Sequence, residues 1–172
     1  DTLFRVASIS KILTAAAALQ LVDAGRLNLH RNVNDYLTQF RIAPAFDAPI
    51  TLYNLLTHSS GFDQDVFGYA ARSPAGQLSL RAYLEQHQPA RVRPPGQFSV
   101  YDNYGFTLAG YLVQQAAGVP FADYVRERLF SPLDMEHSSF TPEAALQPEL
   151  ATGYWLDEGT PRACGPNCIN IN

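Results

Sequence analysis

Hydrophobic residues dominate the stretch from Ser8 to about Ala24, where alanine and leucine recur with little interruption. This composition predicts a helix, and the Gly25 that follows it is a typical C-terminal cap. Because apolar side chains would lie on nearly every face of this helix, we expect it in the middle of a domain. Its longest apolar run, Ile12 to Val22, is interrupted by Thr14 and Gln20 and is too short to cross a bilayer.

Shorter apolar segments, separated by prolines and glycines, predict further helices, so the chain should be mainly helical. Several of them have a recognisable start or stop: Thr51 is a typical N-cap, Gly118 is a typical C-cap, and Pro132 should end the helix before it. Tyr154 and Trp155 are expected on a strand. The expected helices are Tyr36 to Phe40, Leu52 to Thr57, Ser79 to Gln86, Phe106 to Ala117 and Phe121 to Phe130.

An extended segment is expected just before the helix that starts near Phe106. Three prolines and a glycine between residues 89 and 96 interrupt any regular structure there. Alternate side chains of an extended segment point to the same side, so Tyr101 and Asn103 should face one way and Asp102 the other. The sequence therefore predicts that Tyr101 and Asn103 act as a pair.

Composition and charge restrict the function classes. A chain of 172 residues suits one domain or a large piece of one, and 47% hydrophobic with 16% charged residues is an ordinary balance for a soluble protein. The formal net charge of -4 is not accompanied by a basic stripe, which argues against nucleic-acid binding and against a polybasic membrane role. We therefore expect a soluble protein that does not bind nucleic acid.

Two cysteines, Cys164 and Cys168, lie close together near the C-terminus in the segment Cys-Gly-Pro-Asn-Cys. A zinc site needs about four ligands, and no histidine lies near this pair in the sequence. A local disulfide or two loop thiols are the remaining alternatives. We expect neither a metal nor a cofactor.

Candidate chemistry is concentrated at Ser8 and Lys11. Of the 12 lysines and arginines, Lys11 is the only lysine, and it follows Ser8 by three residues. On a helix this spacing brings both side chains to one face, within hydrogen-bond reach. A serine hydroxyl needs an adjacent base, and a lysine can act as one when burial or a neighbour lowers its pKa, whereas arginine keeps its proton. In the first helical turn, the helix dipole would also favour negative charge on the oxygen of Ser8. The alternative is that Ser8 is only a helix cap.

A second candidate for catalysis is His58, which precedes Ser59, Ser60 and Gly61 in a turn signal. A histidine beside serines invites a catalytic triad. No Gly-x-Ser-x-Gly elbow occurs in the sequence, however, and a histidine next to a turn usually bonds to the backbone. We therefore favour Ser8 and Lys11 over a triad.

Several sequence motifs follow one another in an order that is far more specific than the serine and the lysine alone. They are Phe4 to Lys11, Ile50 to Gly61, Tyr101 to Gly105, Leu108 to Tyr111, and the residues around Tyr124, Pro132 and Met135. Together they resemble the serine β-lactamase and penicillin-binding-protein family, in the branch of class C β-lactamases, D-alanyl-D-alanine carboxypeptidases and family VIII esterases. The resemblance extends to about residue 140.

The resemblance implies a role for four residues. Ser8 matches the nucleophile that is acylated, and Lys11 matches its proton-accepting partner. Tyr101 matches the tyrosine that relays protons to the leaving group, and Asn103 matches the asparagine that holds the lysine and the substrate's amide. A cationic Lys11 would lower the pKa of Tyr101, so which of the two takes the proton stays open. The implied substrate is a β-lactam, a D-alanyl peptide or an ester, and the implied location is periplasmic or secreted.

The resemblance also implies the β-lactamase/transpeptidase-like α/β fold, of which this chain would be the helical region. The family's strands upstream of the nucleophile and its C-terminal Lys/His-x-Gly strand, which helps form the oxyanion hole, have no match here. We therefore expect residues 1–172 to be a single partial domain that lacks most of the antiparallel sheet, exposes apolar surface and is a poor catalyst alone. The alternative is a non-catalytic binding module for peptidoglycan-like or peptide ligands.

Overall fold

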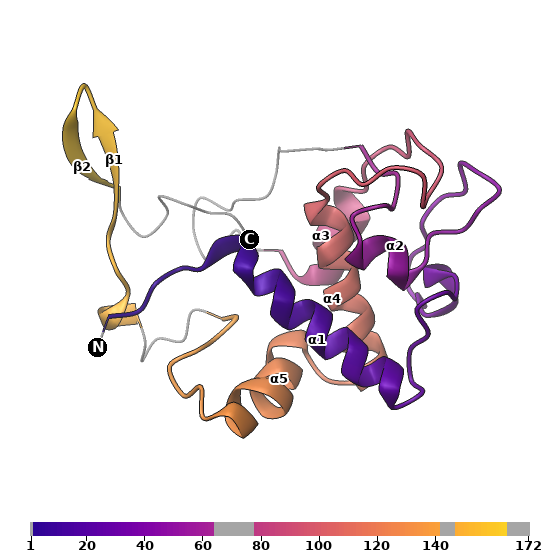
Figure 1. Cartoon of the computed structure of the whole chain (residues 1–172), viewed down its shortest axis with the longest axis horizontal. Coiled ribbons are helices and arrows are strands. Elements are labelled where there is room, and N and C mark those ends of the chain that lie inside the picture. The colour runs from indigo at the N-terminus through magenta and orange to yellow at the C-terminus, as the bar shows by residue number, and fades with distance from the viewer. Residues whose placement is uncertain (1, 64–77, 142–146, 165–172) are drawn as a thin grey trace.

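The computed structural model describes residues 2–63, 78–141 and 147–164. Helices dominate this part of the chain, and two of them, α1 (Ser10–Asp23) and α4 (Asn103–Ala117), pack against each other at its centre (Figure 1). The mainly helical fold predicted from the sequence is confirmed.

Three shorter helices surround this pair. α2 (Leu52–Leu56) and α3 (Leu80–Gln86) pack against α4, whereas α5 (Phe121–Val125) contacts both long helices (Figure 1). Thr51 caps α2 as predicted: its hydroxyl accepts a hydrogen bond from the backbone N–H of Asn54, whose side chain accepts one from the N–H of Thr51. This capping box fixes the point at which α2 begins.

The helix α4 is central because nine of its fifteen residues are buried. It ends, as predicted, at Gly118, whose φ of 75° is the left-handed conformation that glycine adopts without strain. It begins at Asn103 rather than at the predicted Phe106. The side chain of Asp102 accepts a hydrogen bond from the N–H of Gly105, and this N-cap extends the helix by three residues.

The helix α1 buries one side and exposes the other. Ala17, Ala18 and Leu21 are buried in the core, whereas the side chain of Ile12 is 69% exposed. α1 thus lies among the other helices of the described part of the chain, as expected, but one of its faces is not covered there. Gly25 follows the helix with a left-handed φ of 69°, in agreement with the predicted cap. No helix within the described ranges is long and apolar enough to span a membrane.

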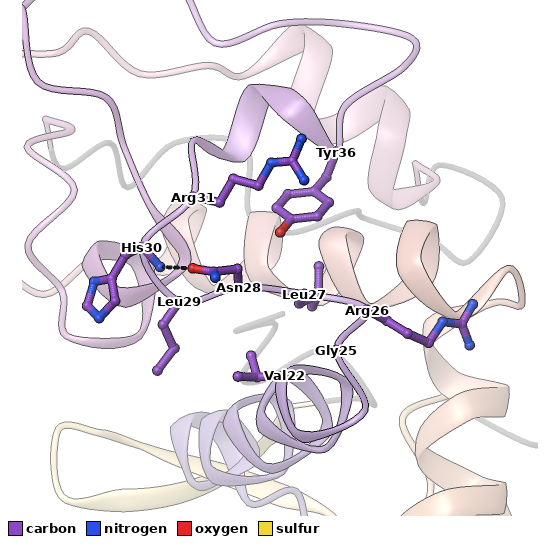
Figure 2. A pocket seen from close by; sticks show the side chains of 9 residues that line it. All are labelled: Val22, Gly25, Arg26, Leu27, Asn28, Leu29, His30, Arg31 and Tyr36. Carbon is purple, nitrogen blue, oxygen red and sulfur yellow. Dashed lines mark hydrogen bonds between the residues drawn. The ribbon is translucent and has the colours of Figure 1, made fainter.

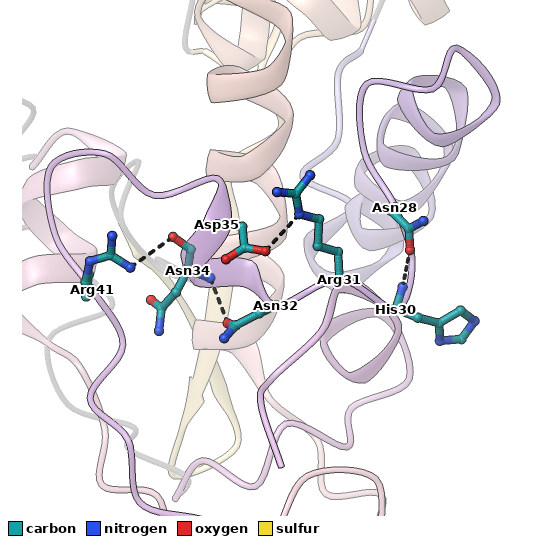
Figure 3. A network of polar contacts seen from close by, with 7 residues as sticks. All are labelled: Asn28, His30, Arg31, Asn32, Asn34, Asp35 and Arg41. Atoms are coloured by element: carbon teal, nitrogen blue, oxygen red, sulfur yellow. Dashed lines mark hydrogen bonds and ion pairs between the residues drawn. The ribbon is translucent and has the colours of Figure 1, made fainter. Parts of the chain in front are cut away.

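The polar segment after α1 forms a loop that side-chain hydrogen bonds hold in place (Figure 3). The side chain of Asn32 accepts from the N–H of Asn34 at 3.0 Å and so starts a 3₁₀ turn, η2 (Val33–Asp35). The guanidinium of Arg41 donates to the carbonyl of Asn34. The short helix predicted over Tyr36 to Phe40 is wrong, because the asparagine cap places the helical turn earlier.

The chain after α5 stays helical for longer than predicted. A π-helical turn, η4 (Arg126–Phe130), leads into a 3₁₀ turn, η5 (Ser131–Leu133). Pro132 was expected to end the helix at Phe130, but it lies in the first turn of η5, where a missing N–H costs no hydrogen bond. The helical path ends at Asp134, whose φ is 53°.

A β-hairpin lies at the end of the described chain, beyond a short 3₁₀ turn, η6 (Gln147–Glu149). Its strands, β1 (Gly153–Asp157) and β2 (Thr160–Cys164), pair antiparallel, and Figure 1 shows the hairpin extending away from the helices. The predicted strand at Tyr154 and Trp155 is confirmed. Cys168 and the side chain of Cys164 lie outside the described residues.

Candidate active site

Ser8 and Lys11 lie where the first helix begins. Ser8 belongs to a 3₁₀ turn, η1 (Ala7–Ile9), and Lys11 lies in the first turn of α1. Ser8 was predicted inside that first turn but precedes it, and Ala7 bends the chain there with a left-handed φ of 43°. The hydroxyl still lies at the N-terminal end of α1, where the helix dipole favours negative charge on its oxygen.

The amine of Lys11 connects three side chains from distant parts of the sequence. Its Nζ lies 3.1 Å from the Oγ of Ser8, 2.7 Å from the Oη of Tyr101 and 2.7 Å from the Oδ1 of Asn103. The hydroxyls of Ser8 and Tyr101 also share a hydrogen bond. The structure thus brings all four predicted site residues into direct contact, while the role of each stays a prediction.

Tyr101 and Asn103 reach the amine from the chain that enters α4. Between them, Asp102 has an extended backbone, with φ of -135° and ψ of 103°. Its side chain therefore turns into the interior while those of Tyr101 and Asn103 point to Lys11, as the alternation predicts. Asn103 is the first residue of α4 rather than part of an extended segment.

Lys11 changes the acidity of the phenol that it contacts. Partial burial alone would raise the pKa of Tyr101, but hydrogen bonds with Lys11 and Ser8 and the positive charge of Lys11 together hold that pKa below its ordinary value of 10.0. The amine also lies 4.7 Å from the centroid of the Tyr101 ring. The phenolate is therefore easier to form here than in free tyrosine, which suits a group that accepts and returns a proton.

Asp102 supports this arrangement from inside the protein. Its side chain is 6% exposed, its Oδ2 accepts a hydrogen bond of 2.5 Å from the hydroxyl of Ser60, and its Oδ1 accepts one of 2.8 Å from the N–H of Gly105. Burial raises the pKa of Asp102, and the hydrogen bonds from Ser60 and Gly105 oppose that rise. Sequence reasoning missed this role, although an Asp that precedes a helical pattern is a recognised N-cap signal.

His58 does not form a triad with its neighbouring serines. The ring Nδ1 of His58 accepts a hydrogen bond of 2.9 Å from the backbone N–H of Asp102. Ser59 bonds instead to Thr57, with its Oγ 2.8 Å from the Oγ1 of Thr57, and Ser60 donates to Asp102. The prediction that this histidine bonds to the backbone is confirmed.

A cavity of about 490 Å³ lies elsewhere, between the end of α1 and the loop after it (Figure 2). Its lining includes Val22, Arg26, Asn28, Arg31 and Tyr36, and holds no serine, cysteine or lysine. No cluster of His, Cys, Asp and Glu that could hold a metal ion occurs among the residues that the structure describes. The chemistry is therefore assigned to the contacts of Lys11 and not to this cavity.

Comparisons with known proteins identify the family of the chain. A family model described as Beta-lactamase matches residues 1–169. Penicillin-binding protein 4 of Amycolatopsis lactamdurans is 31% identical over an alignment of 179 positions, which covers 96% of this chain and 46% of that protein.

Two solved structures share the fold. A β-lactamase/D-alanine carboxypeptidase from Yersinia pestis, crystallised with citrate, is 28% identical with a TM-score of 0.74, and the match covers 86% of this chain and 43% of that one. An octameric penicillin-binding protein homologue from Pyrococcus abyssi is 29% identical with a TM-score of 0.78, and the match covers 95% of this chain and 39% of that one. The chain thus spans less than half the length of these relatives.

Proposed function

Because the chain belongs to the beta-lactamase family, as the match over residues 1–169 shows, we propose that it carries the nucleophile and the proton-transfer groups of a serine hydrolase. Family membership confirms the resemblance that the sequence motifs predicted. The proposed substrate is a small molecule or peptide with a reactive carbonyl: a β-lactam, a D-alanyl peptide or an ester. The names of the relatives, a penicillin-binding protein and a β-lactamase/D-alanine carboxypeptidase, support the first two.

The observation that carries this proposal is the set of contacts made by Lys11. A single amine lies within hydrogen-bond distance of the Ser8 hydroxyl and the Tyr101 phenol, and the two hydroxyls bond to each other. A nucleophile and two groups able to hold its proton therefore form one continuous network. That network is what an activated serine requires.

In the proposed reaction, the Oγ of Ser8 bonds to the carbonyl carbon of the substrate while its proton passes to Tyr101 or Lys11. The bond from that carbon to the leaving nitrogen or oxygen then breaks, and the leaving group takes up the proton. A water molecule next attacks the acyl ester on Ser8, gives its proton to the same network and releases the acid. Serine regains its proton, and the cycle closes.

Asn103 holds the amine in place and contacts the substrate in this proposal. Its Oδ1 accepts a hydrogen bond from Lys11, so its Nδ2 is a donor that can serve a substrate carbonyl. An Asn103→Asp substitution would replace that donor by an acceptor and place a negative charge beside the amine. Substrate binding and proton transfer would both change.

We also propose that residues 1–172 form a single partial domain, the helical part of a larger α/β enzyme. The greater length of the relatives supports this proposal. The sheet, the strand that completes the oxyanion hole and much of the substrate pocket would then come from sequence outside this chain. A periplasmic or secreted location rests on the resemblance alone.

Active-site labelling tests the proposed function. The full-length protein is incubated with a fluorescent penicillin or a fluorophosphonate, and the modified peptide is identified by mass spectrometry. We expect one adduct, on Ser8, and no adduct in Ser8→Ala, with Ser10→Ala as the matched control that still reacts. Labelling that survives in Ser8→Ala would refute the assignment.

A non-catalytic binding module, the alternative from the sequence, is not favoured. Such a module has no need for a lysine, a phenol and a serine hydroxyl in mutual contact, and these contacts are present here. Turnover of nitrocefin, of a D-alanyl peptide and of a p-nitrophenyl ester, measured side by side, would separate lactamase, peptidase and esterase activity.

A further inference from the structure

The turn after α2 runs alongside the extended segment that carries Tyr101. The carbonyl of His58 accepts a hydrogen bond of 2.8 Å from the N–H of Val100, and the ring Nδ1 of His58 accepts one of 2.9 Å from the N–H of Asp102. A single residue thus binds the backbone on both sides of Tyr101. The neighbouring carbonyl of Ser59 accepts from the N–H of Gly96 at 2.8 Å, so the contact continues along the segment.

We propose that His58 is a positioning residue for the reaction: it holds Tyr101 between two backbone hydrogen bonds and so aims the phenol at Ser8 and Lys11. This inference rests on the proposed hydrolase function. His58 itself lies outside the contacts that Ser8, Lys11, Tyr101 and Asn103 make with one another, so it acts through Tyr101 rather than on the substrate.

The ring of His58 also supports the phenol from the side. Its centroid lies 4.7 Å from that of Tyr101 and 4.8 Å from that of Phe106, a residue of α4. The ring contact with His58 and the two backbone hydrogen bonds limit how far Tyr101 can move, and the contact with Phe106 holds the His58 ring itself. A misplacement of about 1 Å in a reacting group can lower a rate about 10²-fold.

The backbone at His58 is held in an unusual conformation. Its φ is 56°, in the left-handed region that is uncommon for residues other than glycine, although histidine, asparagine and aspartate adopt it more often than the rest. In this conformation its carbonyl and its imidazole both reach the segment that carries Tyr101. A strained residue kept at such a position is consistent with a geometric role next to the site.

Only the neutral ring can make the contact with Asp102. A proton on Nδ1 would turn the acceptor into a donor that faces another donor, the backbone N–H. Tyr101 and Asp102, from the segment before α4, contact this ring, and the charge of Lys11 from α1 also acts on it. Burial and the charge of Lys11 lower the pKa of His58 and outweigh the opposite effect of Asp102, so the ring is neutral at neutral pH.

Two substitutions separate the hydrogen bond from the backbone strain. Asparagine tolerates the left-handed conformation, and its Oδ1 is as many bonds from Cα as the Nδ1 of histidine, so His58→Asn keeps an acceptor that cannot be protonated at mildly acidic pH. His58→Gly removes the acceptor without adding strain. The exposed His137 provides the matched control, His137→Asn.

The acylation rate of Ser8 is measured in the full-length protein for each variant, together with thermal stability. We expect His58→Gly to lose about 10²-fold in this rate and His58→Asn to recover most of it, while His137→Asn matches the wild type. A rate in His58→Gly equal to that of the wild type would overturn the proposal. So would an equal loss in His58→Asn, because the acceptor would then not be what matters.

The pH dependence isolates the histidine. The ratio of the wild-type rate to the His58→Asn rate cancels the pH dependence that both proteins share. We expect this ratio to be constant at and above pH 6.5, the ordinary pKa of histidine. At lower pH it should fall as the ring of His58 is protonated in the wild type. A flat ratio would overturn the proposal. If the wild type is not acylated at Ser8 at all, the proposed function fails instead, so the two failures are distinguishable.

Discussion

Among the described residues, the amine of Lys11 contacts a phenol and no carboxylate. In the part of the chain that the structure describes, its hydrogen-bond acceptors are the hydroxyls of Ser8 and Tyr101 and the amide oxygen of Asn103. No anion therefore neutralises the amine through a direct contact there, and its field lowers the pKa of Tyr101. Arginine could not replace it, because a guanidinium keeps its proton and cannot take one from serine.

Asp102 should influence stability through both its hydrogen bonds and its charge. Asp102→Ala would leave the Ser60 hydroxyl and the Gly105 N–H without their acceptor, and we expect the free energy of unfolding to fall by about 2 kcal/mol. Asp102→Asn keeps an acceptor and removes the buried charge, so it should be far less destabilising. Urea unfolding followed by circular dichroism measures both, and an equal loss in the two variants would contradict this account.

The pH dependence of that comparison follows from the raised pKa of Asp102. The folded protein binds the proton of this carboxyl more tightly than the unfolded chain does. The protonated carboxyl therefore contributes its full stabilisation below pH 3.8, the pKa of the group in the unfolded chain. It is lost as pH rises through the folded-state pKa. Relative to Asp102→Asn, the wild type should therefore become less stable between acidic and neutral pH, and a difference that grows in the opposite direction would refute the raised pKa.

The four site residues could be predicted because they form two pairs that are close in sequence. The residues that hold them in place, such as His58 and Asp102, could not. Ser8 and Lys11 stand three apart, and Tyr101 and Asn103 stand two apart, so each pair is visible as a spacing. The contact of His58 with the N–H of Asp102 joins residues 44 positions apart, and no period in the sequence indicates it. A pattern predicts neighbours within an element and does not show which elements meet.

The start of α4 depends on a glycine that leaves room for the capping carboxylate. A Cβ at Gly105 would lie 2.3 Å from the Oδ2 of Asp102, an oxygen already bonded to the buried Ser60. Gly105→Ala should therefore displace the cap and destabilise the protein by about 2 kcal/mol, with a loss of activity as Tyr101 and Asn103 move.

Gly110 provides the matched control within the same helix. A Cβ there would meet the Phe121 ring at an ordinary 3.6 Å, so Gly110→Ala should be neutral or should stabilise by up to about 1 kcal/mol through helix propensity. Thermal unfolding of the two variants gives the comparison. Equal stability of Gly105→Ala and Gly110→Ala would contradict the proposed crowding.

At the scale of elements, the hydrophobic pattern predicted the helices better than their ends. Some ends are visible as caps in the sequence: α2 begins after Thr51, α3 begins after Ser79, and α4 ends before Gly118. Two predicted ends were wrong. α4 begins earlier than predicted because the side chain of Asp102 caps it, and the helical path continues beyond Phe130 because Pro132 lies in the first turn of η5.

Large apolar side chains are exposed near the start of α1. Phe4, Ile9 and Ile12 are 71%, 64% and 69% exposed, and they lie next to the turn that carries Ser8. Isolated apolar side chains are common on surfaces, but this group adjoins the proposed catalytic residues. We expect the part of the enzyme outside this chain to cover it.

Ile12→Asn tests that expectation in two contexts. In residues 1–172 expressed alone, the substitution should reduce self-association measured by light scattering, because an exposed apolar side chain is lost. In the full-length protein it should lower the free energy of unfolding by about 2 kcal/mol, because the same position would be buried and apolar. A full-length protein whose stability is unchanged would show that nothing covers this face.

The sequence alone predicted the mainly helical fold and the family, but not the way α1 and α4 pack against each other. α1 carries apolar residues on every face, so its pattern contains no indication of which face meets α4. That packing brings Lys11 to Tyr101, and it depends on interactions between segments about 90 residues apart. The exposed apolar side chains near its start agree with the proposal that the chain is part of a larger domain, like its longer relatives.

The most direct test of the account is the single-turnover acylation rate of the full-length protein in a double-mutant cycle of Lys11→Met and Tyr101→Phe. If the amine and the phenol handle one proton as a unit, each substitution should lower the rate about 10³-fold and the double variant should be little slower than the worse of the two. A double variant whose fold-loss in rate equals the product of the two single losses would contradict this account. So would a rate near the wild-type value in either single variant.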